Sequence, residues 1–208
     1  HITSINVKKC DVIGFYAPKG GAGVTTIAIN FALYMTSHSQ KVFYFSLEDI
    51  DSTGYYFQVA KESLDDLVKL RDLSESDHLP INIENYINTD LTSNIDYFKI
   101  PISAHYLYEM NFSNIYKIIE ALINRDIYDY IVLDLSSNIG KRNIDLIKYM
   151  NRLILIKNQG KLFQYKLDRF LDEIELYKNR YEEDLYGKIV YFENIDMGEE
   201  LREHRGKQ

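Results

Sequence analysis

Cysteine, long apolar runs and regularly spaced histidines are scarce in this sequence. Its 208 residues include one cysteine, Cys10, so neither an internal disulfide nor a CxxC redox pair can form, which fits a reducing cytoplasm. No apolar run approaches the roughly 18 residues that cross a bilayer, and no signal-peptide pattern is visible. The five histidines, at positions 1, 38, 78, 105 and 204, lack the spacing of metal ligands. We therefore expect a cytoplasmic protein without a histidine-bound metal.

Positive charge is also in short supply. The chain carries 24 Lys and Arg against 31 Asp and Glu, a formal net charge of -7, whereas neutralising nucleic-acid phosphates requires clustered basic side chains. A loose basic group, formed by Lys141, Arg142, Lys148 and Arg152, is interpreted as a solvated face, with a DNA contact as the open alternative. Residues 199–208 are charged throughout and lack the apolar face of a membrane-surface helix. We expect neither nucleic-acid binding nor direct membrane binding through that segment.

The order of the patterned segments indicates an α/β fold. With 46% hydrophobic and 26% charged residues, the composition is that of a globular protein, and the length suits a single domain over residues 1–208. Strands are predicted at 12–16, 42–45, 94–100, 128–137, 152–156 and 188–192. Helices are predicted at 25–36, from 61 onward, after Pro80, at 114–124 with Ser113 as its cap, at 143–150 and at 162–181. Such alternation predicts a doubly wound, mostly parallel sheet with helices on both faces.

The clearest chemical pattern is VIGFYAPKGGAGVTT, residues 12–26. A strand, a glycine turn and a helix N-terminus in this order form a cradle for anions, because backbone N–H groups converge there and the helix dipole favours negative charge. Glycines allow the backbone to approach phosphate oxygens closely. The standard loop GxxxxGK[ST] has a lysine where this chain has Val24, and a lysine stands instead at the front, as Lys19. From the glycines alone, a turn without a ligand is the open alternative.

Two acidic features of the sequence follow predicted strands. Asp134 closes the most strand-like stretch, and the carboxyl ends of strands are where open α/β sheets bind ligands. Glu48 follows the second strand, in a cluster with Asp49 and Asp51. The cluster makes it ambiguous which of these acids belongs to a site. The alternatives are a strand-ending Asp that caps a turn and a solvated acidic turn.

The motif KGGAGVTT followed by IVLD resembles the MinD/ParA superfamily of dimerising P-loop ATPases, whose deviant Walker A motif reads KGGxGx[ST]T. The resemblance covers about residues 7–194. The motif keeps the front lysine, Lys19, and lacks the second lysine, at position 24. This combination is similar to that of the TadZ/CpaE branch, which helps to place pilus assembly machinery. Those relatives often carry a receiver-like domain before the ATPase domain, so the chain, which starts at His1, could be excised from a longer protein.

The resemblance implies ATP and Mg²⁺ as cofactors and a role for each matching residue. Lys19 would reach the nucleotide of the partner in a homodimer, Glu48 would position the attacking water, and Asp134 would serve as the Walker B acid. Thr25 would join Asp134 in holding magnesium, and Thr26 would contact the α-phosphate. Phosphate contacts are expected from Lys19, Gly20, Gly21, Ala22, Gly23, Val24, Thr25 and Thr26. Asn194 loosely matches an asparagine that reads adenine.

The departures from the family pattern predict slow or absent hydrolysis. Val24 removes one charge-assisted contact, worth about 1.5–3 kcal/mol, and Ser46 replaces the first of two acids common in the superfamily. The implied function is an ATP-dependent, dimer-forming localisation factor that partner proteins of a pilus or secretion apparatus recruit to a cell pole or membrane complex. The alternatives are a ParA-like DNA-partitioning ATPase and a degenerate scaffold that binds no nucleotide.

Overall fold

The computed structural model describes residues 10–58, 70–72, 74–75, 83–98, 110–138 and 140–194, which form one α/β unit around a seven-stranded sheet. The strands are β1 (Asp11–Tyr16), β2 (Val42–Leu47), β3 (Ile87–Thr89), β4 (Asp96–Phe98), β5 (Tyr130–Leu135), β6 (Arg152–Lys157) and β7 (Ile189–Glu193). The helices are α1 (Val24–Ser37), α2 (Thr53–Tyr56), α6 (Phe112–Ile123), α7 (Lys141–Ile147) and α8 (Lys161–Tyr181), with 3-10 turns η1 (Ile83–Tyr86) and η2 (Tyr186–Lys188). No helix in these ranges is long and apolar enough to cross a membrane.

The sheet has the order β3-β4-β2-β5-β1-β6-β7 and confirms the predicted doubly wound architecture. Every neighbouring pair is parallel except β3 and β4, which are antiparallel. Asp134 on β5 stands opposite Phe15 on β1 and Ser46 on β2. This register brings the carboxyl ends of the three central strands to one edge, where the segments that follow β1, β2 and β5 meet.

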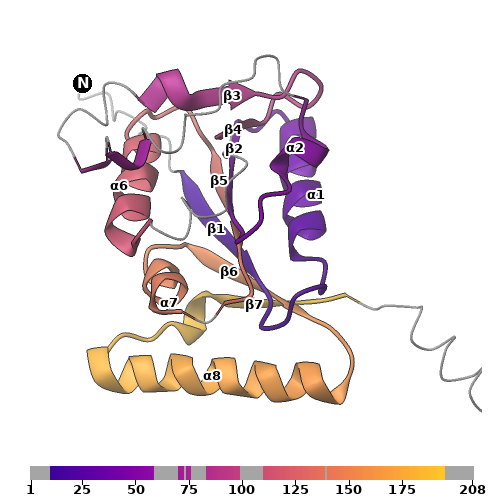
Figure 1. The fold of residues 1–208 in the computed structure, drawn as a ribbon, viewed down its shortest axis with the longest axis vertical. Helices are drawn as coiled ribbons and strands as arrows, with labels where there is room; N and C mark the ends of the chain where they lie inside the picture. The colour runs from indigo at the N-terminus through magenta and orange to yellow at the C-terminus, as the bar shows by residue number, and fades with distance from the viewer. Residues whose placement is uncertain are drawn as a thin grey trace, which may run out of the picture.

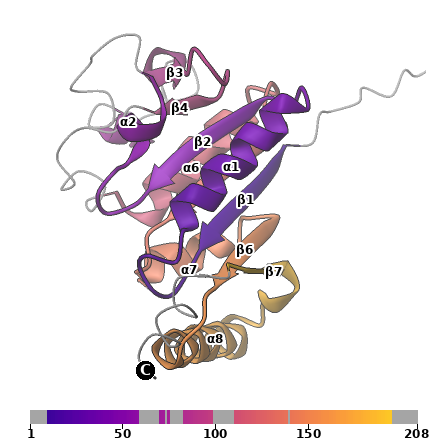
Figure 2. The same cartoon turned by 90° about the vertical axis from the view of Figure 1, so that its right-hand side faces the viewer.

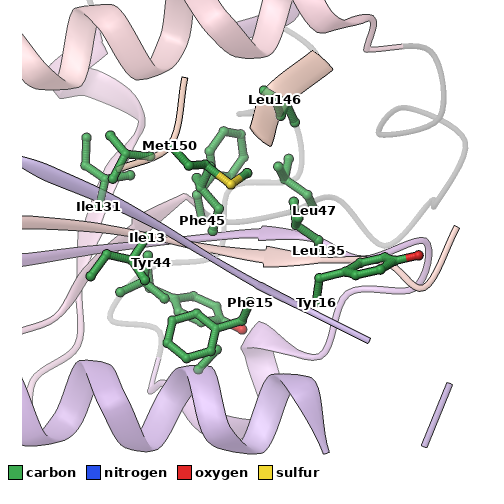
Figure 3. Close-up of a cluster of buried hydrophobic side chains, with 14 of the residues drawn as sticks. Ile13, Phe15, Tyr16, Tyr44, Phe45, Leu47, Ile131, Leu135, Leu146 and Met150 are labelled. Carbon is green, nitrogen blue, oxygen red and sulfur yellow. The ribbon is translucent and has the colours of Figure 1, made fainter. Parts of the chain in front are cut away.

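Helices cover both faces of the sheet. Figure 1 places α1 on one side of the strands and α6 and α7 on the other, and Figure 2 shows α1 in front of β1 and β2 with α6 behind them. Between these layers lies a cluster of buried apolar side chains, shown in Figure 3. Gly14 on β1 has a packing role, because an added Cβ would collide with the sulfur of Met150 and lie 3.2 Å from Leu153.

The start of α6 differs from the prediction. The cap is Asn111 and not Ser113, because the Asn111 side chain accepts a 3.0 Å hydrogen bond from the backbone N–H of Asn114. The Asn114 side chain accepts in return from the backbone N–H of Asn111 at 3.1 Å. This reciprocal capping box satisfies two N–H groups at the helix end that would otherwise lack partners.

The region between β2 and α6 also differs in part. The helix expected after Pro80 is a single 3-10 turn, η1, and Ile87 then opens β3, which was not predicted. The strand expected from residue 94 begins only at Asp96, because Asn94 has a left-handed backbone with φ of 58°. The helix expected from residue 61 onward lies largely outside the described residues, although residues 70–72 are helical.

Candidate functional site

The loop that joins β1 to α1 has the shape of an anion cradle. Gly21 and Gly23 have φ of 78° and 85°, in the left-handed region that favours glycine. A Cβ added at Gly21 would meet nothing within 4 Å, so the backbone there borders open space. No side chain of the described residues caps the 14-residue helix α1 at Gly23, and its first turn carries no acid. The N–H groups of that turn are therefore free to donate to an anion.

A pocket of about 280 Å³ lies over this cradle. It draws its walls from three segments that are distant in sequence but meet at the carboxyl edge of the sheet. Its lining residues are Lys19, Gly20, Gly21, Gly23, Val24, Thr25, Thr26, Glu48, Leu135, Ser136 and Ser137. The structure thus brings most of the predicted nucleotide contacts together with Glu48, and their roles toward a nucleotide stay predictions.

Lys19 lines this pocket from the front of the loop and is half-buried. Within the described part of the chain, its ammonium group makes no hydrogen bond or ion pair. At the usual lysine position, Val24 presents an apolar side chain to the same pocket. The positive charge available to a bound anion therefore comes from the front of the loop rather than from the helix.

Glu48 is the acid of its cluster that faces the loop. Its carboxylate accepts a 2.8 Å hydrogen bond from the hydroxyl of Thr25 and a 2.7 Å bond from that of Ser52. Asp51 instead accepts from the backbone N–H and the hydroxyl of Thr53, and Asp49 lines a different pocket near the starts of α6 and α7. Of these three acids, Glu48 is the one hydrogen-bonded to the glycine loop in the described residues, so the geometry favours it for the predicted role, which stays a prediction. Ser52 as its second partner was not predicted.

Asp134 directly precedes the pocket-lining Leu135 on β5, is completely buried, and does not itself line the pocket. Its Oδ2 accepts a 2.7 Å hydrogen bond from the hydroxyl of Tyr44 on β2, whereas Oδ1 is buried with no hydrogen-bond partner in the described residues. Burial and the negative charge of Glu48 raise the pKa of Asp134 to about 7, although the hydrogen bond from Tyr44 favours its charged form. A buried carboxyl oxygen without a donor is a position that a cation or its bound water can satisfy.

These oxygen atoms suit a hard cation such as magnesium. Hydroxyl and carboxylate oxygens are the donors that Mg²⁺ prefers, and Thr25, Glu48 and Asp134 supply them at one place. No group of three or more His, Cys, Asp or Glu residues in the described ranges could hold a metal alone. Mg²⁺ is commonly held by one or two protein groups together with substrate phosphates, so the residues fit a magnesium–nucleotide complex. When bound there, magnesium would supply neutralisation of phosphate charge.

Hydrogen bonds connect the segment after β5 to α7. The side chain of Asn143 donates to the carbonyl oxygens of Ser136 and Asn138 at 3.1 and 2.7 Å. Ser136 and Ser137 both line the pocket over the glycine loop. Asn143 was not predicted, since an asparagine near a helix start carries no specific signal in the sequence.

Asn194 contacts the loop rather than standing apart from it. Its side-chain amide donates to the carbonyl oxygen of Ala22 at 2.9 Å, and its backbone N–H donates to Lys157 at 2.9 Å. A Cβ at Gly23 would lie 2.9 Å from the same amide nitrogen. Close by, a pocket of about 520 Å³ opens between the end of β6 and the start of α8. Asn194 therefore braces the cradle, and its predicted contact with adenine remains a prediction.

A glycine loop between a central strand and a helix, in a mostly parallel sheet, defines a P-loop NTPase fold of the ParA and MinD type. The model of a family described as AAA domain matches residues 10–186, and the chain belongs to that family. A comparison with curated proteins finds no match.

Solved structures support this assignment of the fold. A ParA family ATPase from Chlorobium tepidum TLS superposes with a TM-score of 0.70 at 18% identity, covering 88% of this chain and 73% of that chain. Cobyrinic acid a,c-diamide synthase from Mycobacterium smegmatis, with a bound ATP analogue and magnesium, gives 0.65 at 15% identity, covering 90% and 75%. The cell division protein MinD from Aquifex aeolicus gives 0.62 at 17% identity, covering 93% and 73%. At such identities the likeness shows the fold alone.

Proposed function

We propose that the protein binds ATP with magnesium in the pocket over residues 19–26. The observation that carries the proposal is the convergence of Thr25 and Glu48, joined at 2.8 Å, on a glycine cradle that Lys19 also lines. The unpartnered buried Oδ1 of Asp134 adds a further oxygen for the cation. The synthase named above was crystallised with an ATP analogue and magnesium on the same fold, which supports this choice of ligand.

The nucleotide then acts as a clamp between two copies of the chain. Lys19 lines the front of the pocket without a partner in the described residues, as expected of a group that completes a neighbouring site. The segment that follows Glu48 also exposes apolar side chains, with Ile50 and Tyr55 80% and 87% exposed. Exposed apolar side chains beside a charged pocket favour burial against another protein surface.

Hydrolysis is slow in this proposal. Glu48 accepts hydrogen bonds from Thr25 and Ser52, so part of the acceptor capacity that would orient a water is already in use. Val24 leaves out one phosphate contact, and Ser46 supplies no carboxylate. The site is therefore expected to bind ATP for longer than an efficient ATPase does, which suits a localisation factor.

The cellular role is inferred from the resemblance to the TadZ/CpaE branch. We propose that the clamped dimer presents a surface to proteins of a pilus or secretion apparatus, which recruit it to a cell pole or membrane complex. The net charge of -7 favours such protein partners over DNA.

Calorimetry with ATP and magnesium tests the proposal on the wild type, on Lys19→Ala and on Lys166→Ala. Lys166 is an exposed lysine on α8 and serves as the matched control. We expect Lys19→Ala to weaken binding by about tenfold or more, the worth of a charge-assisted contact, and to reduce the ATP-dependent dimer seen by light scattering. Lys166→Ala should match the wild type. Absence of binding in the wild type would contradict the proposal, and DNA-stimulated turnover would support a partitioning ATPase instead.

A further inference from the structure

A buried tyrosine hydroxyl is connected directly to the acid of the site. Tyr44 lies on β2, is 1% exposed, and packs edge-on against Phe57 with ring centroids 5.4 Å apart. Its hydroxyl donates to Oδ2 of Asp134 at 2.7 Å. Burying a hydroxyl is costly unless it finds a partner, and this one finds its partner in the predicted Walker B acid.

The two oxygens of Asp134 are consequently unequal. Oδ2 is occupied by Tyr44, and Oδ1 has no hydrogen-bond partner in the described part of the chain. Because a carboxylate can rotate about its Cβ–Cγ bond, a donor fixed on one oxygen also fixes the direction of the other. Groups that hold a metal ligand in this way commonly change metal affinity by 10–100-fold when they are removed.

We propose that Tyr44 is a positioning residue. Its hydroxyl orients Asp134 so that, of the two carboxylate oxygens, Oδ1 serves the magnesium of the bound nucleotide and Oδ2 does not. The inference rests on the proposed function, since it assigns a role within the same site. In this role, Tyr44 itself would touch neither the cation nor the phosphates.

A second tyrosine–aspartate pair in the same sheet provides a matched control. The hydroxyl of Tyr128 donates to Oδ2 of Asp96 at 3.0 Å, and both residues are buried. Asp96 is already satisfied by the hydroxyl of Thr89 at 2.6 Å and by the ammonium of Lys41 at 2.8 Å. This pair lies at the amino ends of β4 and β5, at the opposite edge of the sheet from the phosphate loop.

The test compares Tyr44→Phe with Tyr128→Phe. ATP affinity is measured by calorimetry in magnesium and in EDTA, and the ratio of the two gives the contribution of the cation. We expect Tyr44→Phe to lower this ratio by about tenfold or more while leaving the affinity in EDTA unchanged. Tyr128→Phe should keep the wild-type ratio, although it loses a buried hydrogen bond of the same kind. A general loss of structure would lower both affinities together.

Each outcome decides the inference. An unchanged ratio in Tyr44→Phe overturns it, and a raised ratio would show that the hydroxyl competes with the cation, which also overturns it. A wild type that does not bind ATP refutes the proposed function itself, whereas a wild type that binds ATP but gives an equal ratio in both variants refutes only the role of Tyr44. If Tyr44→Phe does not fold, fluorotyrosine placed at position 44 alone gives a second measurement. The chemical shift of its fluorine should change when magnesium joins the ATP complex, and an unchanged chemical shift would overturn the inference.

Discussion

The buried carboxyl of Asp134 should make the stability of the free protein fall as pH rises. Its pKa is raised from an ordinary 3.8 to about 7, chiefly by burial and next by the charge of Glu48. Between these two values the folded state binds more protons than the unfolded state, so the free energy of unfolding decreases with pH. The contribution of Asp134 to the free energy of unfolding is therefore most favourable below the pKa of the unfolded state, and it is lost progressively as pH rises to the pKa of the folded state. At about 1.36 kcal/mol for each pH unit, Asp134 costs about 2–3 kcal/mol between pH 5 and pH 8.

Replacing this acid isolates its contribution. Asp134→Asn keeps an oxygen to accept from Tyr44 but has no proton to lose, so its free energy of unfolding should exceed that of the wild type by about 2–3 kcal/mol more at pH 8 than at pH 5. Urea denaturation without nucleotide, at several pH values across this interval, measures the difference directly. Asp96→Asn is the control, because it removes a buried carboxylate that is paired with Lys41 at the opposite edge of the sheet. Parallel curves for Asp134→Asn and the wild type would refute the reasoning.

Three further predictions test other parts of the structure. Gly14→Ala should lower the free energy of unfolding by about 1–3 kcal/mol in urea denaturation, because the new methyl group collides with Met150; a stability equal to the wild type would contradict this packing. Asn111→Ala should cost about 1 kcal/mol through loss of the cap of α6, whereas Ser113→Ala should cost much less, and equal losses in the two variants would disprove the assignment of the cap. Val24→Lys should strengthen ATP binding in calorimetry by the worth of a charge-assisted contact, about 1.5–3 kcal/mol, and an unchanged affinity would show that no contact is missing at that position.

The central part of the fold could be predicted because local and long-range signals agree there. The apolar run of β1, the glycines and the apolar helix after them predict a strand, a turn and a helix without reference to any other segment. Asp134 was expected at the ligand-binding edge because it closes a central strand, and Glu48 was expected in the site because it follows the second strand, where the family it resembles has an acid. The structure places Glu48 in the pocket and Asp134 directly before the pocket-lining Leu135.

The side-chain partners within the site could not be predicted in the same way. All six residues of β2 are buried, so its sequence has no polar alternation to indicate that Tyr44 points toward Asp134. Similarly, β3 has three residues and depends on Asp90, whose carboxylate accepts from the backbone N–H groups of Gln58 and Ser93, both at 2.8 Å. Such a strand has too little pattern of its own and is specified by contacts distant in sequence.

The hydrogen bond from Asn194 to Ala22 joins residues 172 positions apart and has a consequence for how the protein matures. During synthesis, the residues of the glycine loop leave the ribosome long before β7, and without Asn194 the loop lacks its brace. The anion cradle can therefore acquire this contact only after β7 has been made, although its own residues are among the first to be made. A chain cut just before β7 should keep the central strands but lose the hydrogen bond that fixes the glycine loop. The affinity for a ligand would then show whether β7 has joined the sheet.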